Sequence, residues 1–240
     1  MPWDFAAILA FIAIAVPLLG RRRIQQLMRM PQTTKAERLT LYASTVAFQW
    51  VAVAVILWRV TARRIAASSL GLTIPSPPLV VLVSTLLSVV ILANQVVSLR
   101  RLALLPTQAQ GILPQLATKV FPQDNPERLA FCAVVATVSV CEELIFRGFA
   151  QSVLQNSTQG SVSAGLVGSS ALFALAHLYQ GRRGLSATFV VGILLASARI
   201  WTGSLIPPMV AHFLADLTAG FFAPRQFRQM SANSSESKML

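Results

Sequence analysis

Charged residues are scarce in this sequence, and acidic residues most of all. Charged residues make up 12% of its 240 residues and only 8 are acidic, whereas 55% are hydrophobic. Because a soluble domain carries about 25% charged residues, an ordinary soluble fold is excluded. The apolar residues gather in runs of about 20, the length of helix that crosses a bilayer. The sequence therefore predicts an integral multi-pass membrane protein, an all-α polytopic bundle of about seven transmembrane helices.

Cysteine is nearly absent as well. The two cysteines, Cys132 and Cys141, lie nine residues apart in one apolar run. At 100° per residue they point to opposite faces of a helix, so they cannot form a disulfide with each other. The cysteines give no information about the redox compartment.

The excess of positive charge fits a membrane protein better than a nucleic-acid-binding one. The formal net charge is +12, but no extended soluble domain is present to bind a nucleic acid. The basic residues cluster beside the apolar runs, where lysine and arginine hold loops on the cytoplasmic side. Such clusters contain Arg21, Arg22, Arg23, Arg29, Arg100 and Arg101. The pattern predicts a cytoplasmic C-terminus, in a plasma or internal membrane, and no nucleic-acid partner.

Polar linkers divide the apolar runs. We expect spans at roughly 4–20, 41–58, 79–98, 128–153, 163–179, 184–200 and 204–222. The first run ends in arginines and lacks a cleavage site, so we expect it to be retained as a span. Asp124 or Asn125 is expected to cap the fourth span. Three regions result: N-terminal helices and loops over 1–124, core helices over 125–222, and a polar tail without regular structure over 223–240.

Ionisable residues lie inside three of these spans. The acids and histidines among them are Glu142, Glu143, His177, His212 and Asp216. Ionisable residues at membrane depth cost at least ~2.5 kcal/mol each on insertion scales and usually mark a functional site. We therefore expect one shared polar pocket. The alternative is five separately satisfied residues that hold helices together.

The stretch CEELIFRGF, residues 141–149, contains two of these acids and an arginine. Glu143 and Arg147 are four residues apart with the acid first, which is the better orientation for an ion pair on one helix face. We expect this pair to be structural. Glu142 lies 100° around the helix and has no such partner. An unpaired carboxylate in an apolar surrounding suits work as a general base.

The two histidines lie on separate spans. FALAHLY places His177 near the end of the fifth span, and HFLAD places His212 and Asp216 four residues apart on one face of the seventh. A lone histidine in a helix is often only a hydrogen-bonded core residue. Asp216 either orients His212 through a ring nitrogen or joins the pocket directly.

The three motifs together resemble a known family. CEELIFRG resembles its EExxxR motif, FALAH its FxxxH motif and HFLAD its HxxxN/D/B motif. The chain thereby resembles the CPBP family (CAAX protease and bacteriocin-processing, also called Abi), which are intramembrane glutamic endopeptidases related to the Ras-converting enzyme. The resemblance covers roughly residues 125–222, and the first three spans add nothing specific to it.

The resemblance implies roles for the site residues. Glu142 matches the catalytic glutamate, which with His177 would activate a water to attack a peptide carbonyl. His212 and Asp216 match the pair that would stabilise the oxyanion or hold the site. Asp216 departs from the commoner asparagine, and an anion beside an oxyanion is unfavourable unless Asp216 is protonated or only orients His212. The substrate would be a peptide or membrane protein, prenylated or not, and no cofactor is expected.

Other functions stay open at this point. Glu142, His177 and His212 would make a His₂Glu zinc site, although no HExxH motif is present. A non-enzymatic immunity or assembly factor would keep the polar pocket for stability alone. A proton-coupled transporter would use the same carboxylates, but no inverted repeat with broken helices is visible.

Overall fold

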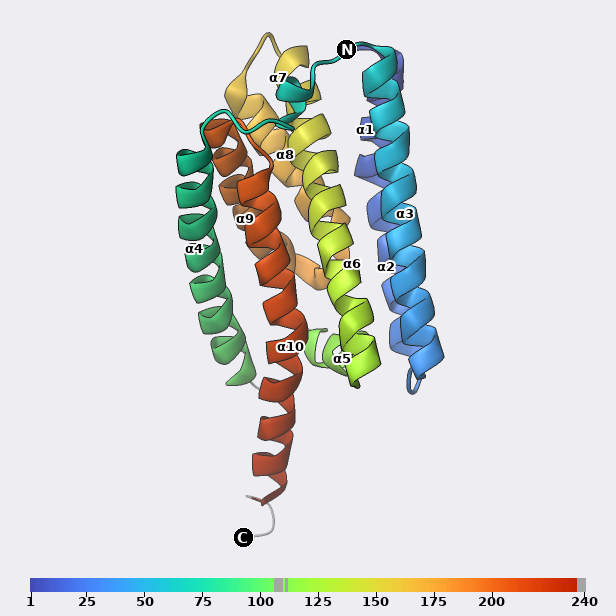
Figure 1. Ribbon diagram of the computed structural model, residues 1–240. Coiled ribbons are helices and arrows are strands. Elements are labelled where there is room, and N and C mark those ends of the chain that lie inside the picture. The colour runs from blue at the N-terminus through green and yellow to red at the C-terminus, as the bar shows by residue number, and fades with distance from the viewer. Residues whose placement is uncertain (106–109, 111, 237–240) are drawn as a thin grey trace.

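The computed structural model describes residues 1–105, 110 and 112–236, and these form a bundle of helices (Figure 1). An isolated β-bridge joins Leu72 to Ser204. In chain order the elements are α1 (Trp3–Ala10), the π-helix η1 (Phe11–Ala15), α2 (Val16–Arg29), α3 (Lys35–Ala62), the 3₁₀-helix η2 (Ala67–Leu70), α4 (Pro77–Ala103), α5 (Leu113–Lys119), α6 (Asn125–Glu143), the π-helix η4 (Leu144–Ala150), α7 (Gln151–Ser157), α8 (Val162–Ala176), the 3₁₀-helix η5 (Leu178–Gln180), α9 (Gly181–Thr202) and α10 (Ile206–Glu236).

Every apolar run that was expected to span the membrane is helical. In the described part of the chain, five continuous helical segments are long and apolar enough to cross it: Trp3–Arg29, Lys35–Ala62, Pro77–Leu102, Asn125–Ser157 and Leu178–Thr202. The remaining two expected spans correspond to shorter apolar helices, Val162–Ala176 and Ile206–Phe222. A bilayer crossing needs about 20 residues, so the five long segments reach this length and the two shorter helices fall below it.

One expected boundary is shifted, and one expectation about the tail is wrong. The fifth expected span, 163–179, ends as an α-helix at Ala176, because His177 has φ −98° and ψ 19° and the chain tightens there into η5. The tail from residue 223 was expected to be irregular, but α10 continues to Glu236. No glycine follows Gly220 in the sequence to end this helix.

Side-chain caps set where the helices begin. Thr34 and Glu37 form a capping box at the start of α3. The Asp124 carboxylate accepts the Glu127 N–H at the start of α6, as the sequence predicts. The Lys35 ammonium, 2.6 Å from Asp124, and this N–H hold the pKa of the Asp124 carboxyl below its usual value. Asp124 is therefore negatively charged at neutral pH, which favours the N-terminus of α6.

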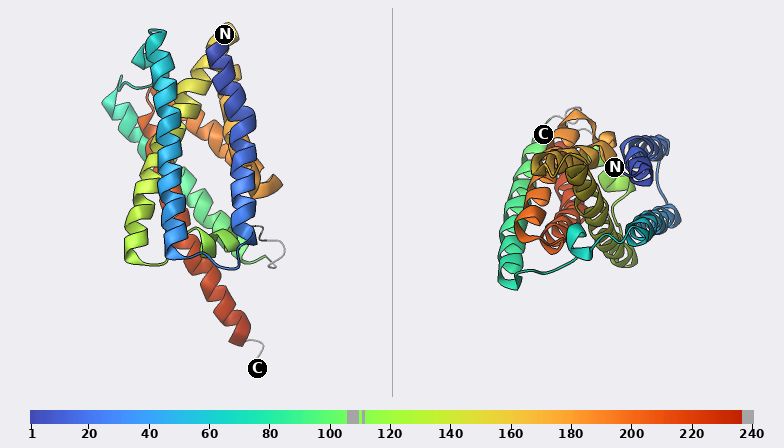
Figure 2. Two further views of the ribbon diagram at one scale, coloured as in Figure 1. Left: turned by 90° about the vertical axis from the view of Figure 1, so that its right-hand side faces the viewer. Right: turned by 90° about the horizontal axis from the view of Figure 1, so that it is seen from above.

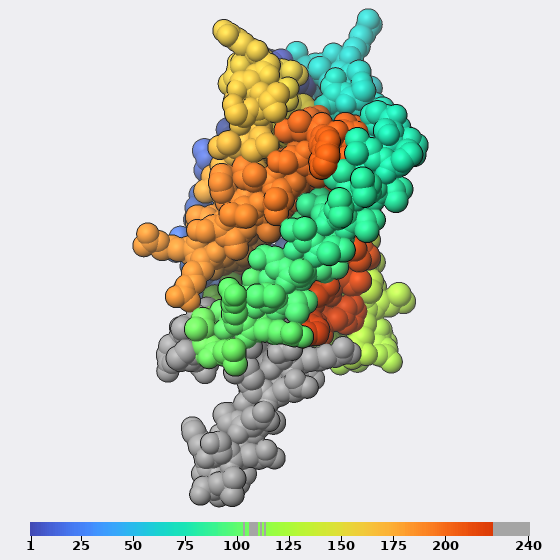
Figure 3. Space-filling view, turned by 90° about the vertical axis from the view of Figure 1, so that its left-hand side faces the viewer, coloured from blue at the N-terminus to red at the C-terminus, as the bar shows by residue number. Residues whose placement is uncertain are grey.

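The first three helical segments pack on different parts of the core. α3 packs against α6 and η4, whereas α2 packs against α8 and η5. Figure 2 shows α3 and the α1–α2 segment as two separate rods on the same side of the bundle. On the opposite side, α4 and α9 lie next to each other across the surface (Figure 3). α10 packs on α4, α6 and α9 behind them.

Ion pairs hold α3 at its two ends. At the upper end in Figure 1, Asp4 of α1 accepts hydrogen bonds from Arg59 at 2.8 Å and from Arg63 at 2.6 Å. At the lower end the buried Arg38 binds the buried Glu127 of α6 through two guanidinium nitrogens. These contacts fix α3 beside both the first helix and the core. The space between α3 and the α1–α2 segment is thereby bounded at one end and along one side.

Candidate active site

The two glutamates lie where the α6 helix changes its winding. Glu142 and Glu143 end α6, and the π-helix η4 follows directly at Leu144. A π-helical turn accommodates an extra residue and occurs often at functional sites. The whole of η4 is buried. The segment that carries Arg147 is therefore a widened turn in the interior and not the regular helix that the sequence pattern predicts.

Glu143 is the centre of a buried charge network. Its Oε1 atom accepts a hydrogen bond from Arg147 Nη1 at 2.8 Å and another from His212 Nδ1 at 2.7 Å. Glu143 and Arg147 are fully buried, and His212 is 7% exposed. The ion pair that the sequence predicts is present, and it includes a third member from α10. Removing one partner of such a network leaves a buried charge without compensation.

Phe173 joins this network to the rest of the site. The Arg147 guanidinium lies 4.0 Å from the centre of the Phe173 ring, within the range of a cation–π interaction. The same ring lies 4.7 Å from the His177 ring and 5.8 Å from the His212 ring, each edge to face. Phe173 is 3% exposed. The phenylalanine of the FALAH stretch thus places both histidines and the arginine around one apolar surface.

Glu142 faces another helix, as its position 100° from Glu143 predicts. Its Oε1 atom accepts a hydrogen bond of 2.9 Å from Gln49 Nε2 on α3. Its Oε2 atom is buried and has no hydrogen-bond partner among the described residues. A buried carboxylate oxygen without a partner is costly, so this atom is available to a water or a substrate.

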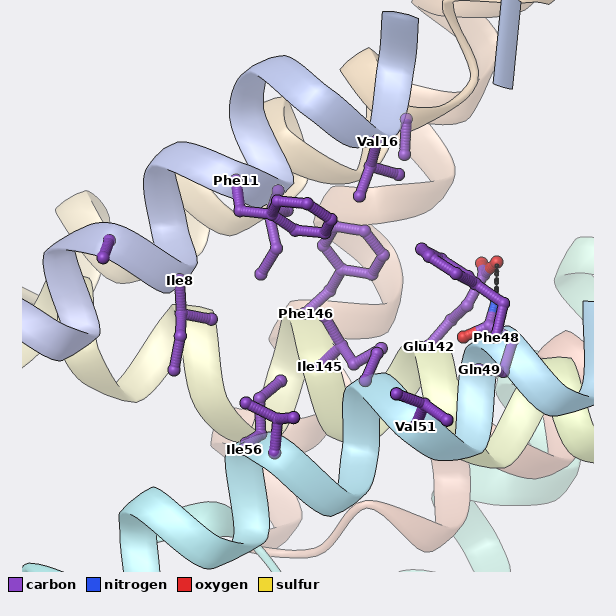
Figure 4. A pocket seen from close by; sticks show the side chains of 15 residues that line it. Ile8, Phe11, Val16, Phe48, Gln49, Val51, Ile56, Glu142, Ile145 and Phe146 are labelled. Carbon is purple, nitrogen blue, oxygen red and sulfur yellow. Dashed lines mark hydrogen bonds between the residues drawn. The ribbon is translucent and has the colours of Figure 1, made fainter. Parts of the chain in front are cut away.

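An apolar cavity of about 420 Å³ opens beside Glu142. Figure 4 shows side chains of the first helix, α3 and η4 around it, with the hydrogen-bonded Glu142 and Gln49 toward one end. Its apolar lining includes Ile8, Phe11, Phe48, Val51, Ile145 and Phe146. The cavity lies between α3 and the α1–η1–α2 segment, which pack on different parts of the core.

His177 has one ring nitrogen engaged and one without a hydrogen-bond partner among the described residues. Its Nδ1 atom lies 2.9 Å from the Phe173 carbonyl oxygen. A carbonyl can only accept, so Nδ1 carries the hydrogen and Nε2 of the neutral ring is an acceptor. The Tyr179 ring lies 5.9 Å from the His177 ring.

Asp216 lies next to the other ring nitrogen of His212. The Asp216 Oδ2 atom is 3.5 Å from His212 Nε2, and the Asp216 side chain is 41% exposed. Of the two arrangements left open by the sequence, the described geometry has Asp216 beside the ring that Glu143 holds from the other side. Glu143, Arg147, His212 and Asp216 form one connected set, whereas Glu142 reaches α3.

Three residues of this site have no prediction from the sequence. Gln49, Phe173 and Tyr179 were not assigned a role, although Phe173 and Tyr179 stand in the FALAHLY stretch. Gln49 carries the clearest signal that was available, since it is a polar residue in the middle of an apolar run and is buried. Such a residue in a span needs a polar partner.

The described residues do not form a metal centre. No group of three or more His, Cys, Asp or Glu side chains among residues 1–105, 110 and 112–236 is arranged to hold a metal ion. Glu142 is hydrogen-bonded to Gln49, and His212 Nδ1 is engaged by Glu143.

Comparison with known proteins identifies part of the chain. Residues 125–218 match the family model described as type II CAAX prenyl endopeptidase Rce1-like. No curated protein and no solved structure matches the chain. The matched range contains Glu142, Glu143, Arg147 and both histidines, together with Asp216. Residues 125–218, which are less than half of the chain, are therefore similar to the type II CAAX prenyl endopeptidase Rce1-like family.

Proposed function

We propose that this chain is an active intramembrane endopeptidase that hydrolyses a peptide bond with a water activated by Glu142 and His177. The observation that carries the proposal is the buried, unpartnered Oε2 atom of Glu142, which stands beside an apolar cavity while Oε1 is held by Gln49. A positioned carboxylate with one free oxygen is the arrangement that a general base needs. Glu143, its neighbour in sequence, also has an unpartnered Oε2 atom, but its Oε1 atom accepts from Arg147 and His212, and Glu143 does not line the cavity.

The proton movements follow from these contacts. Glu142 Oε2 takes a proton from the water as the oxygen attacks the carbonyl carbon of the substrate. His177 Nε2, the free acceptor of its ring, holds the second hydrogen of that water and so fixes its direction. Glu142 then returns its proton to the nitrogen of the leaving amine as the carbon–nitrogen bond breaks. Gln49 keeps Glu142 in place throughout, through the hydrogen bond to Oε1.

His212 is proposed to stabilise the oxyanion of the tetrahedral intermediate. Its Nδ1–H is donated to Glu143, so Nε2 donates only when the imidazole is positively charged. The carboxylates of Glu143 and Asp216 lie on the two sides of the ring and would balance this charge. In this proposal Asp216 balances the positive charge of His212 and does not itself donate to the oxyanion.

The lining of the cavity favours a substrate with an apolar segment. Its walls carry aliphatic and aromatic side chains, with Glu142 and Gln49 as its polar groups. A protein or peptide segment that places an apolar side chain or lipid chain in this space would bring a neighbouring peptide bond to Glu142. The substrate class we propose is therefore a peptide or membrane protein with an apolar segment near the cut, prenylated or not.

We also propose that all seven apolar helices cross the membrane, with the C-terminus in the cytoplasm. The last turn of α2, which carries Arg29, and the last turn of α4, which carries Arg100 and Arg101, lie at the lower end of Figure 1, toward the C-terminal end of α10. At the opposite end, Arg59 and Arg63 are paired with Asp4, which weakens their effect on orientation. A reporter enzyme fused to the C-terminus, active only in the cytoplasm, is expected to be active. Inactivity of a correctly inserted fusion would reverse the orientation.

The zinc peptidase is tested by metal removal. We expect purified, active protein to contain no stoichiometric zinc and to keep its activity in the presence of a chelator, because the proposed chemistry assigns every proton to Glu142, His177 or His212. The measurement is elemental analysis of the active preparation together with a chelator titration. Activity that is lost on chelation and restored by zinc alone would replace the glutamic mechanism with the metal-dependent one.

A further inference from the structure

A second cavity, of about 540 Å³, lies on the other side of the His177 segment. It is bounded by the second half of α2, by Tyr179 of η5 and by the first turns of α9. Three arginines from two separate helices line it: Arg21, Arg29 and Arg182. Convergence of cations from distant parts of the sequence distinguishes this cavity from an ordinary row of basic residues along one helix.

These three arginines have no anionic partner in the part of the chain that the structure describes. The arginines that form salt bridges with acidic residues in the described part of the chain are different ones: Arg38, Arg59, Arg63 and Arg147. Every acidic side chain that the structure describes is engaged elsewhere, and these are Asp4, Glu37, Asp124, Glu127, Glu142, Glu143 and Asp216. The cavity is therefore lined by three cations, and none of the acidic side chains that the structure describes lines it.

The position of the cavity matches the depth of phospholipid headgroups. Arg21 directly follows the apolar run from Phe5 to Gly20, so it stands where the first span leaves the hydrocarbon. Arg182 stands in the first turn of α9, at the start of the candidate span Leu178–Thr202, so the cations from both helices lie at the ends of apolar runs. Tyr179, Met28 and Leu185 add an aromatic and apolar wall.

We infer that this cavity binds a phosphate group, carried by the headgroup of an anionic phospholipid or present as free phosphate. Arginine guanidinium groups match the geometry of phosphate oxygens and bind them with charge-assisted hydrogen bonds. The apolar wall formed by Met28 and Leu185 would contact the upper part of a lipid chain. A bound headgroup would also pack against Tyr179, whose ring neighbours His177.

The test compares two triple variants of the full-length protein. One variant, Arg21→Gln/Arg29→Gln/Arg182→Gln, removes the cations of the cavity. The matched control, Arg22→Gln/Arg100→Gln/Arg101→Gln, removes the same charge from exposed arginines that do not line it. Lipid bound to the detergent-purified proteins is counted by native mass spectrometry after titration with phosphatidylglycerol or phosphatidylcholine. Free inorganic phosphate is titrated separately against thermal unfolding.

Wild type and the control are expected to bind phosphatidylglycerol at least about 10-fold more tightly than the cavity variant. A shift by inorganic phosphate alone that the cavity variant loses, with no preference for phosphatidylglycerol, would assign the site to soluble phosphate. Equal binding by all three proteins, or an equal loss in both variants, would overturn the inference. Unfolding without ligand checks that the cavity variant folds; if it does not, the single change Arg182→Gln is compared with Arg101→Gln in the same way.

Discussion

Glu142→Gln protein is expected to hydrolyse peptide at least ~100-fold more slowly than wild type, the smaller end of the range for removing a general base. The amide cannot take a proton from water, so the attacking oxygen stays a poor nucleophile. The fold should be unaffected, because the new amide oxygen can accept the same hydrogen bond from Gln49 that Glu142 Oε1 accepts now. The measurement is single-turnover hydrolysis by purified protein, together with its thermal unfolding.

A graded variant separates the role of Glu142 from a general disturbance of the site. Gln49→Leu removes the hydrogen bond to Glu142 Oε1 but leaves the carboxylate. We expect it to be slower than wild type and clearly faster than Glu142→Gln, since the base is present but less well held. If Glu142→Gln protein turned over substrate at the wild-type rate, the assignment of Glu142 as the general base would be wrong. A Gln49→Leu protein as inactive as Glu142→Gln would make the positioning of the carboxylate as important as its chemistry.

Arg147→Ala is expected to reduce stability by roughly 3–5 kcal/mol, the cost of removing one partner of a buried ion pair. Arg147 is fully buried and donates to Glu143, which is also fully buried. Its loss leaves a carboxylate with His212 as its remaining hydrogen-bond partner and removes the cation above the Phe173 ring. The measurement is thermal unfolding and expression level in a membrane or detergent, compared with wild type.

Removing both members of the pair should be milder than removing one. In Glu143→Leu/Arg147→Leu no uncompensated charge is buried, although His212 loses the acceptor of its Nδ1–H. We therefore expect the double variant to unfold at a higher temperature than Arg147→Ala while having low activity, because His212 is no longer held. If Arg147→Ala expresses and unfolds like wild type, the structural role of the pair is wrong.

The helices and much of the site could be predicted because lipid leaves few alternatives. Backbone groups in hydrocarbon must pair within the segment, so long apolar runs become helices. For the same reason the charged residues of these runs, such as Glu143 and Arg147, are found in one interior network. The 100° step between adjacent residues correctly separates Glu142 from that network.

What the sequence did not predict depends on packing between distant segments. Gln49 is 93 residues from Glu142, and no local pattern relates them. The π-helix over Leu144–Ala150 carries no distinct signal, because its residues are ordinary for an apolar α-helix. The hydrogen bond from His212 to Glu143 joins α10 to α6 across 69 positions. Each of these features is set by how the helices pack against one another.

The central claim, that Glu142 activates water for cleavage of membrane peptides, is tested most directly by identifying new C-termini. Purified wild-type and Glu142→Gln proteins are incubated separately with the same membrane extract, and peptide ends are compared by mass spectrometry. We predict a set of cleaved peptides, with apolar residues near the cut, that appears with wild type and is absent with Glu142→Gln. Identical sets of peptide ends from the two proteins would contradict the claim.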